Sequence, residues 1–276
     1  MDISVVIPYY NRHEVFGETL DSVLAQTLPP KEIVVVDDCS EPASSAYLTQ
    51  FKSIRVIRLD RNRGAGGARN VGAMAANGPL IAFQDSDDIW EPHKLEIQWN
   101  YLKDHPECIG VHAGAKSRYR DGSEAVWDHK PEHVTLRDAL PTNCITPQTL
   151  LIRKDAFLEL GGFDESLPPC EDHEFSIRVT KAGLKVGYVR EVVVTVRREG
   201  QQRIDADWRK YLASQTRILK IHEALYREVL GPESLRQCRA MYIRRSGVKR
   251  GRILGRLMRV WGIILGGFHR PDYIVD

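Results

Sequence analysis

Three carboxylates lie within four positions of this chain, at the end of an apolar segment. In the stretch GPLIAFQDSDDIW, Asp85, Asp87 and Asp88 follow residues 80–84. Carboxylates this close together disfavour joint ionisation unless a cation or hydrogen-bond donors offset their repulsion, and oxygen ligands suit Mg²⁺ or Mn²⁺. The group is therefore a candidate divalent-metal site, and the alternative is a solvated turn that caps the next helix.

A second acidic pair and a glycine-rich segment have the composition of a nucleotide site. Asp37 and Asp38 follow the β-branched run 32–36, where a carboxylate can accept hydrogen bonds from a nucleobase or a ribose; a turn or helix N-cap is the alternative. Residues 61–70, RNRGAGGARN, place three arginines at a helix entry, where they could face a diphosphate. The segment has neither the Walker lysine nor the GxGxxG order, so alone it is weak evidence.

A third acidic group, Glu171 and Asp172, opens a predicted helix after a Pro-Pro-Cys turn. Carboxylates in this position can act as a catalytic base, or they can simply complement the helix dipole. His173 follows them and invites a metal interpretation, but we expect an exposed first-turn histidine instead.

Strands and helices alternate along the first half of the chain and would position these groups. The predicted strands, all expected to be buried on both faces, are residues 3–8, 32–36, 54–59 and 80–84, and the predicted intervening helices are residues 13–26 and 66–77. This alternation indicates βαβ units in an α/β fold with a mostly parallel sheet, which places its ligands at the carboxyl ends of the strands.

The second half of the chain has a less regular pattern. The predicted elements are a helix at 91–106, irregular strands within 109–128, helices near 155–162 and 171–183, and a strand at 185–198. From about Asp205 the sequence predicts two or three helices and no strand. We expect a catalytic domain over residues 1–204 and a basic helical extension over residues 205–276.

Composition and charge indicate where the protein acts and which kinds of site it does not have. Residues 205–276 carry 15 Lys and Arg against 7 Asp and Glu, or +8, whereas residues 1–204 are net acidic. The five cysteines are dispersed without a CxxC pair, which disfavours a disulfide framework and a zinc site and favours a reducing, cytoplasmic location. No secretory signal is recognisable, and the apolar stretch 261–268 falls short of the roughly 20 residues needed to span a bilayer.

Five motifs in order resemble the inverting nucleotide-sugar glycosyltransferases of family 2, over roughly residues 2–200. They are SVVIPYYNR, EIVVVDDCS, RNRGAGGARNVG, IAFQDSDDIW and GGFDESLPPCEDHEFSIR. The resemblance implies a GT-A fold, in which a nucleotide-binding half and an acceptor half share one continuous, Rossmann-like sheet flanked by helices. The final seventy residues are not explained by it.

The resemblance also implies roles for individual residues. The nucleotide-sugar contacts it implies are Pro8, Tyr10, Asn11 and Arg12 at the end of the first strand, Asp38 after the second, Arg69 and Asn70 at the helix beside the nucleotide, and Asp85 and Ser86 in the DxD segment. Asp87 would hold a divalent metal, Mn²⁺ or Mg²⁺, with Asp85 assisting. Asp172 would be the catalytic base, with Glu171 beside it, and Arg197 and Arg198 would approach the diphosphate.

The sequence thus predicts an inverting glycosyltransferase that uses a nucleotide diphosphate sugar, most simply a UDP-sugar, and a saccharide or lipid-linked saccharide acceptor of surface polysaccharide synthesis. The alternatives are a non-catalytic nucleotide-sugar-binding or scaffold relative, and a sugar-phosphate nucleotidyltransferase. The basic, apolar segment 236–276 predicts peripheral contact with the inner face of an anionic membrane, or packing on the catalytic domain or a partner. No nucleic-acid partner is expected, because no recognised binding fold accompanies the charge.

Overall fold

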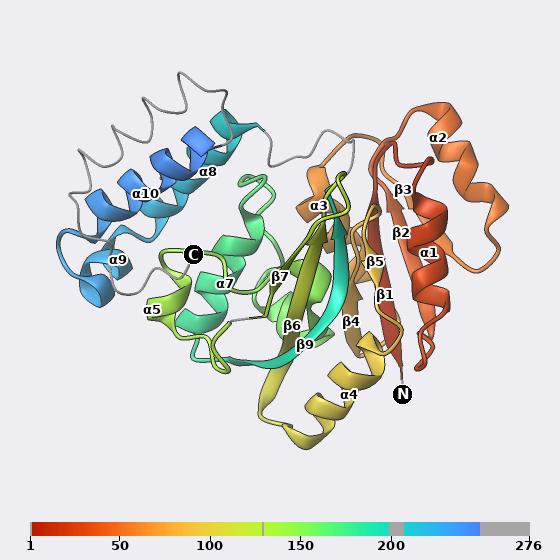
Figure 1. The fold of residues 1–276 in the computed structure, drawn as a ribbon, viewed down its shortest axis with the longest axis horizontal. Helices are drawn as coiled ribbons and strands as arrows, with labels where there is room; N and C mark the ends of the chain where they lie inside the picture. The colour runs from red at the N-terminus through yellow and green to blue at the C-terminus, as the bar shows by residue number, and fades with distance from the viewer. Residues whose placement is uncertain (1, 129, 199–206, 249–276) are drawn as a thin grey trace.

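The computed structural model describes residues 2–128, 130–198 and 207–248 (Figure 1). One nine-stranded sheet runs through it in the order β3-β2-β1-β4-β8-β6-β9-β5, and β7 pairs with β6. The strands are β1 (Ile3–Tyr9), β2 (Glu32–Asp37), β3 (Arg55–Arg58), β4 (Leu80–Phe83), β5 (Ile89–Trp90), β6 (Cys108–Arg118), β7 (Glu124–Trp127), β8 (Leu151–Arg153) and β9 (Lys185–Arg197). The single continuous sheet agrees with the expected α/β architecture.

Helices cover this sheet and extend beyond it. They are α1 (Phe16–Leu24), α2 (Pro42–Tyr47), α3 (Gly64–Ala75), α4 (Lys94–Asp104), α5 (Leu136–Ala139), α6 (Lys154–Glu159), α7 (Glu171–Lys181), α8 (Trp208–Ile221), α9 (Glu223–Leu230) and α10 (Ser234–Val248). Short 3₁₀ turns occupy Leu48–Gln50 and Pro147–Thr149.

The first four strands form a parallel unit. β1 pairs in parallel with β2 and β4, and β2 pairs in parallel with β3. Tyr9 lies opposite Asp37 in this register, so the chain leaves β1 and β2 at the same edge of the sheet. β1, β2 and β4 are buried on both faces as predicted. The prediction for β3 was wrong, because β3 is the edge strand and its residues are largely exposed.

Beyond β4 the sheet, which we expected to be mostly parallel, is mixed. β8 runs antiparallel to both β4 and β6, whereas β6 and β9 form a long parallel pair. β5 and β7 add antiparallel partners to β9 and β6. The antiparallel strand β8 therefore joins the parallel unit to the second half of the sheet.

Alternation along β1 builds a hydrophobic core on each face of the sheet. Val5 and Ile7 point to one face, where they belong to the cluster that contains Phe16 and Leu20 of α1. Val6 points to the other face, where four phenylalanine rings pack with one another. These rings are Phe83, Phe157, Phe163 and Phe175. The second cluster fixes α7 against the sheet, and α7 carries the Glu171-Asp172 pair.

Residues 207–248 form three helices without a strand, as predicted, and lie beside α5 and α7 (Figure 1). They share a hydrophobic cluster with those helices, including Leu140 and Ile177 on one side and Ile218, Tyr226 and Tyr242 on the other. For residues 236–248, the described part of the segment 236–276, the alternative of packing on the rest of the chain is confirmed. The predicted domain boundary at residue 204 stays a prediction, and most of the predicted membrane segment, residues 249–276, lies outside the described residues.

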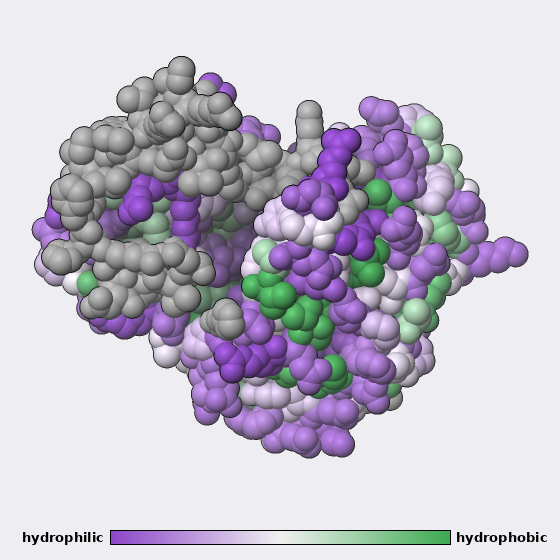
Figure 2. Space-filling view, in the orientation of Figure 1, coloured by the Kyte–Doolittle hydropathy of each residue, from purple (hydrophilic) through white to green (hydrophobic). Residues whose placement is uncertain are grey.

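In the described ranges, no helix combines the length and apolar content needed to cross a bilayer. The face drawn in Figure 2 is mainly hydrophilic, and its hydrophobic side chains appear in small groups rather than in one broad patch.

Candidate functional site

The carboxyl ends of β1 and β2 are joined by the residues predicted to face the nucleotide. The backbone N–H of Asn11 donates to Ser40 Oγ (3.0 Å), and Asn11 Oδ1 accepts from the N–H of Glu41 (2.9 Å). Asn11 and Cys39 both have positive φ, 51° and 63°, which is unfavourable for most side chains. Such strain is retained where surrounding contacts dictate the backbone, often at ligand sites.

The two aspartates after β2 have different environments. Asp37 is fully buried and accepts from Ser45 Oγ (2.6 Å), from the N–H of Ser40 (2.9 Å) and from Arg58. Burial opposes the ionised form of Asp37, but these donors outweigh it and lower its pKa. Asp38 accepts from the N–H of Arg63 (2.7 Å), yet burial raises its pKa. Asp37 thus has a structural role, and Asp38 remains the candidate for ligand contact.

The DSDD segment forms a tight turn after β4, in which the N–H of Asp88 donates to the carbonyl of Asp85 (3.2 Å). Asp88 points inward and is 3% exposed, because its carboxylate accepts from the N–H of Arg197 (3.1 Å). The side chains of Asp85 and Asp87 are 27% and 33% exposed. Asp87 Oδ2 lies 3.5 Å from Arg12 Nε. The two carboxylates of the DxD are therefore the ones that a ligand can reach.

Arg69 connects this turn to α7. Its guanidinium lies 2.5 Å from Asp85 Oδ1 and 3.3 Å from Glu171 Oε1, and its side chain is 7% exposed. Burial disfavours the charge on Arg69, but Asp85 and Glu171 outweigh burial and raise its pKa. Burial likewise raises the pKa of Glu171, against the opposing charge of Arg69. Arg69 thus links the DSDD turn, which carries the candidate metal ligands, to α7, which carries the candidate base Asp172.

Asp172 lies at the start of α7 and stays partly exposed. Asn143 Nδ2 donates to Asp172 Oδ2 (2.6 Å), and the N–H of His173 donates to Asp172 Oδ1 (2.8 Å). Desolvation and the neighbouring charge of Glu171 raise the pKa of Asp172 to about 7, although Arg69 and Lys130 act in the opposite direction. A carboxylate with a pKa near neutrality is suited to accept a proton.

The expected exposure of His173 was wrong. His173 is 1% exposed, with Nδ1 3.0 Å from Gln215 Oε1 and Nε2 2.9 Å from the carbonyl of Ala139. Burial lowers its pKa to about 4, so the imidazole is neutral. The sequence could not indicate this, because the covering partner Gln215 comes from α8, beyond the matched motifs.

Other predicted residues hold the site together. Asn70 donates to the carbonyl of Phe163 (2.8 Å) and accepts from its N–H (2.8 Å), so its amide fixes the 162–165 loop. Pro8 and Ser86 are buried, and Ser86 offers its carbonyl to Thr19 Oγ1 (3.2 Å). Tyr10 is 48% exposed and accessible to a ligand.

The arginine pair after β9 also has structural contacts. Arg197 Nε donates to the carbonyl of Asp87 (2.6 Å), and Arg197 Nη1 donates to Glu18 (2.7 Å). Arg198 Nε donates to Ser117 Oγ (2.9 Å), and its guanidinium stacks over Trp127 at 5.0 Å. Arg197 therefore ties the DxD turn to α1.

Two polar residues near Asp172 carry no recognisable motif. Asn143 is one; the other is Lys130, whose Nζ donates to the carbonyl of Cys144 (2.6 Å) and whose pKa burial lowers to about 8. Both come from the connection between β7 and β8. No periodicity or spacing in that connection singles them out.

A divalent cation would find hard oxygen donors in the exposed carboxylates of Asp85 and Asp87, which fit Mg²⁺ or Mn²⁺. Within the part of the chain that the structure describes, no three His, Cys, Asp or Glu side chains converge as a ready-made metal cluster.

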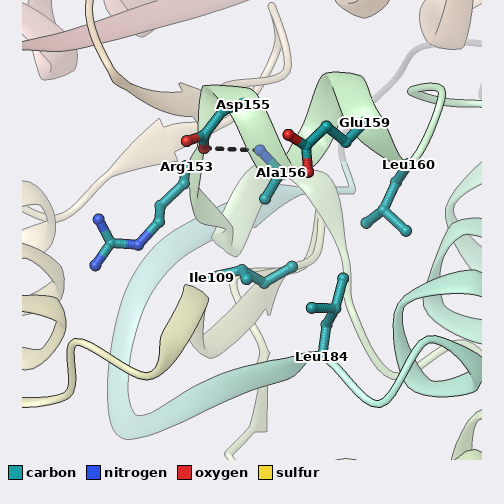
Figure 3. Close-up of a pocket in the computed structure, with 7 residues that line it drawn as sticks. All are labelled: Ile109, Arg153, Asp155, Ala156, Glu159, Leu160 and Leu184. Atoms are coloured by element: carbon teal, nitrogen blue, oxygen red, sulfur yellow. Dashed lines mark hydrogen bonds between the residues drawn. The ribbon is translucent and has the colours of Figure 1, made fainter.

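A separate pocket of about 340 Å³ lies among Ile109, Arg153, Asp155, Ala156, Glu159, Leu160 and Leu184 (Figure 3). Leu80, at the start of β4, is the register partner of Arg153. The pocket is thus at the edge where the parallel strands begin, opposite the edge that carries the DSDD turn. We assign the functional site to the carboxyl edge, where the titratable groups converge.

Comparison with known proteins points to one family. Residues 4–161 match the model of the family described as Glycosyl transferase family 2. The chain is 35% identical over 158 residues to the putative teichuronic acid biosynthesis glycosyltransferase TuaG of Bacillus subtilis (strain 168), covering 55% of this chain and 62% of TuaG. It is 39% identical over 98 residues to the Escherichia coli UDP-Glc:alpha-D-GlcNAc-diphosphoundecaprenol beta-1,3-glucosyltransferase WfgD, covering 35% of this chain and 39% of WfgD.

These matches are partial, whereas the structural likeness extends over nearly the whole chain. The chain spans less than two thirds of the length of TuaG and of an uncharacterized glycosyltransferase of Haemophilus influenzae, at 62% and 61%. The crystal structure of S. aureus TarS 1–349 in complex with UDP-GlcNAc matches with a TM-score of 0.66 at 18% identity, over 96% of this chain and 89% of TarS 1–349. The fold is thus the expected GT-A fold. Because the family model covers more than half of its residues, the chain belongs to glycosyl transferase family 2.

Proposed function

We propose that this protein is an inverting glycosyltransferase that moves a sugar from a nucleotide diphosphate donor, most simply a UDP-sugar, to a hydroxyl group. One observation carries the proposal: buried Arg69 bonds both Asp85 of the DxD turn and Glu171, the neighbour of Asp172. These contacts support the proposal, because they link the carboxylate turn expected to bind the metal and diphosphate to the helix that carries the expected base. The crystal structures of S. aureus TarS 1–349 include complexes with UDP-GlcNAc and with UDP, and the name of WfgD contains UDP-Glc.

The donor would lie along the carboxyl ends of β1, β2 and β4. Asp38 would contact the base, and Tyr10 and Arg12 would flank the nucleoside and diphosphate. Asn11 would shape this pocket through its contacts with Ser40 and Glu41. Pro8, Ser86 and Asn70 would act through packing and loop placement, because their groups are buried or already bonded.

Asp87, assisted by Asp85, would hold a divalent cation, Mn²⁺ or Mg²⁺. A bound cation supplies charge stabilisation to the departing nucleoside diphosphate. The arginines beside these carboxylates, Arg12 and Arg69, keep the turn from accumulating unopposed negative charge. They would also offer positive charge to the diphosphate.

Asp172 would act as the general base. It would accept the proton of the acceptor hydroxyl while the acceptor oxygen bonds to the anomeric carbon and the bond from that carbon to the diphosphate oxygen breaks. The products are the glycoside, the nucleoside diphosphate and protonated Asp172. A single in-line displacement of this kind inverts the anomeric configuration.

The acceptor would be a saccharide or a lipid-linked saccharide of a surface polysaccharide. The names of TuaG and WfgD refer to teichuronic acid biosynthesis and to a diphosphoundecaprenol-linked acceptor. Residues 249–276 would hold the protein at the cytoplasmic face of the membrane by their basic and apolar side chains. Sedimentation with vesicles of anionic and of neutral lipid, with and without those residues, tests the attachment; equal binding by the shortened chain would contradict it.

A panel of nucleotide sugars tests the activity itself. We expect Mn²⁺- or Mg²⁺-dependent binding of at least one UDP-sugar by calorimetry, together with slow hydrolysis of that donor. Asp172→Asn should bind the donor normally and lose transfer. Failure to bind any nucleotide sugar would refute the proposal, and full transfer by Asp172→Asn would refute the base assignment.

A further inference from the structure

The carboxylate of Asp172 is held from two directions. On its own helix, the backbone N–H of His173 donates to Oδ1 (2.8 Å). From the connection before β8, Asn143 Nδ2 donates to Oδ2 (2.6 Å). Each oxygen thus has a fixed donor, and the Asn143 contact is the one that depends on tertiary structure.

The orientation of the Asn143 amide is itself fixed. Its Oδ1 accepts from Ser176 Oγ (2.9 Å) and from the N–H of Ile145 (3.1 Å). The amide NH₂ group therefore faces Asp172, because the reverse orientation would set the NH₂ against the N–H of Ile145 and the amide oxygen against the carboxylate of Asp172. Ser176 lies one helical turn after Asp172, and its Oγ is also 2.9 Å from the carbonyl of Asp172, so its one proton is shared between that carbonyl and Asn143 Oδ1. Asn143, Ser176 and Asp172 therefore form a closed network.

The segment that carries Asn143 is anchored on its other side. Arg245 Nη1 donates to Thr142 Oγ1 (3.2 Å), Tyr242 Oη donates to the carbonyl of Pro141 (3.2 Å), and Tyr226 Oη donates to the carbonyl of Leu140. These donors come from α9 and α10, outside the segment matched by the family model. The position of Asn143 is thus set by the C-terminal helices as well as by α7.

We propose that Asn143 is a positioning residue for the base, which holds the Asp172 carboxylate in its reactive orientation and favours its ionised form. The inference rests on the proposed function for its catalytic consequence. A hydrogen bond donated to a carboxylate stabilises the charged form, so removal of the Asn143 amide raises the pKa of Asp172 further.

Other charged groups around Asp172 also affect its ionisation, so the test must leave them in place. Glu171 on α7 opposes ionisation of Asp172, whereas Arg69 on α3 and Lys130 before β8 favour it. None of these groups is removed when Asn143 is replaced. An altered titration in an Asn143 variant therefore reports the lost amide contact.

The test uses the full chain with Asn143→Ala and Asn143→Asp, and the exposed Asn100 on α4 supplies matched controls, Asn100→Ala and Asn100→Asp. The first readout is the Asp172 titration by NMR of protein labelled with ¹³C at aspartate carboxyls, assigned with Asp172→Asn. The second is the acid limb of kcat/KM. For Asn143→Ala we expect both midpoints to rise by about one pH unit, the effect of one charge-assisted hydrogen bond. Asn143→Asp should shift them further, because a second carboxylate then faces Asp172.

The affinity for the nucleotide sugar should be unchanged in all four variants, because the residues expected to bind it lie at the ends of β1, β2 and β4. If Asn143→Ala does not fold, Ser176→Ala frees the Asn143 amide from one of its two fixing donors and should give a smaller shift in the same direction. Unchanged NMR and kinetic midpoints in the folded variants would overturn the inference. A wild-type protein without transfer activity would refute the proposed function alone, since the NMR titration still decides whether Asn143 controls Asp172.

Discussion

At the level of single residues, the proton affinity of Asp172 determines the pH range of the proposed reaction. Desolvation and Glu171 raise its pKa to about 7, and a general base must be deprotonated to act. We expect kcat/KM to fall tenfold per pH unit below about 7 and to level off above it. Asp172→Asn should lower kcat by about 10²- to 10⁴-fold at pH 8.

The matched control for this prediction is Asp155→Asn, an exposed aspartate on α6 beside the separate pocket. It should leave the pH profile unchanged. An acid limb near pH 4 in the wild-type enzyme would contradict the raised pKa of Asp172.

Arg69 carries a second prediction at this scale, because it neutralises two carboxylates while buried. Arg69→Met should lower the free energy of unfolding by about 3–5 kcal/mol, since removal of one partner leaves buried charge without compensation. The loss should shrink at acid pH. Glu171 can then take up a proton, and a neutral carboxyl carries no buried charge that the guanidinium must offset.

Urea denaturation of wild type, Arg69→Met and Arg69→Lys at pH 8 and pH 5 measures the effect. Arg69→Lys should fall between the others, because an ammonium keeps the charge but cannot reproduce the fork of a guanidinium. Equal stability of wild type and Arg69→Met at pH 8 would show that the two contacts contribute nothing net.

Sequence reasoning placed several of these residues correctly because local signals mark them. Asp38, Asp85 and Asp172 each follow a strand or open a helix, and those positions can be read from hydrophobic runs and turn residues. Asn143 and the burial of His173 could not be predicted, because their partners lie on elements distant in sequence. The specific roles of the site residues stay predictions.

At the level of secondary-structure elements, the packing of α3 on β1 depends on a close approach at Gly72. A Cβ at this position would lie 2.3 Å from Val6 Cγ1, and Val6 is a fully buried β-branched side chain with little rotational freedom. Gly72→Ala should therefore destabilise the fold by about 1–3 kcal/mol, despite the usual preference of helices for alanine.

A double-mutant cycle with Val6→Ala tests whether this contact is the cause. Removal of the Val6 methyl groups vacates the space that the new Cβ needs, so the double variant should be more stable than the sum of the single losses predicts, by about 0.5–3 kcal/mol. Additive losses would locate the strain elsewhere in α3.

Some strands could be predicted from the sequence and others could not, for a physical reason. β1, β2 and β4 are continuous apolar runs because both of their faces are buried. β8 has three residues and β5 has two, too few for any periodicity, so their pairing is determined by tertiary contacts with β4, β6 and β9. The mixed second half of the sheet could not be predicted from local pattern alone.

At the level of the whole molecule, the described C-terminal helices complete the core around α7 rather than standing apart from it. Tyr226 and Tyr242 are almost fully buried, and their hydroxyls serve the carbonyls of Leu140 and Pro141. The basic charge of residues 205–276 did not predict this packing, because charged side chains lie mainly on the exposed face of a helix and say nothing of the face that packs. Family resemblance ended before these helices, so their contribution emerged only from the structure.

This arrangement predicts that a change in the C-terminal helices lowers the rate of glycosyl transfer without weakening the binding of the donor nucleotide sugar. The double variant Tyr226→Phe/Tyr242→Phe keeps both rings. It removes the hydroxyl that donates to the carbonyl of Pro141, and it leaves the carbonyl of Leu140 with only His173 Nε2 nearby (3.2 Å), at a cost of about 1–3 kcal/mol for a buried group that loses its donor. We expect kcat for transfer to fall about tenfold, because a displacement of the base by even a fraction of an ångström weakens general-base catalysis. The Kd of the nucleotide sugar should stay at its wild-type value.

Tyr9→Phe provides the matched control, since it removes a buried hydroxyl that donates to the carbonyl of Ser44 (2.9 Å) in the nucleotide half. It should cost similar stability but weaken donor binding instead of lowering kcat at saturating donor. Calorimetry with the nucleotide sugar and steady-state kinetics on both variants separate the two effects. Equal changes in kcat and Kd in both variants would mean that the hydroxyls act only through global stability, and the C-terminal helices would then have no specific connection to the base.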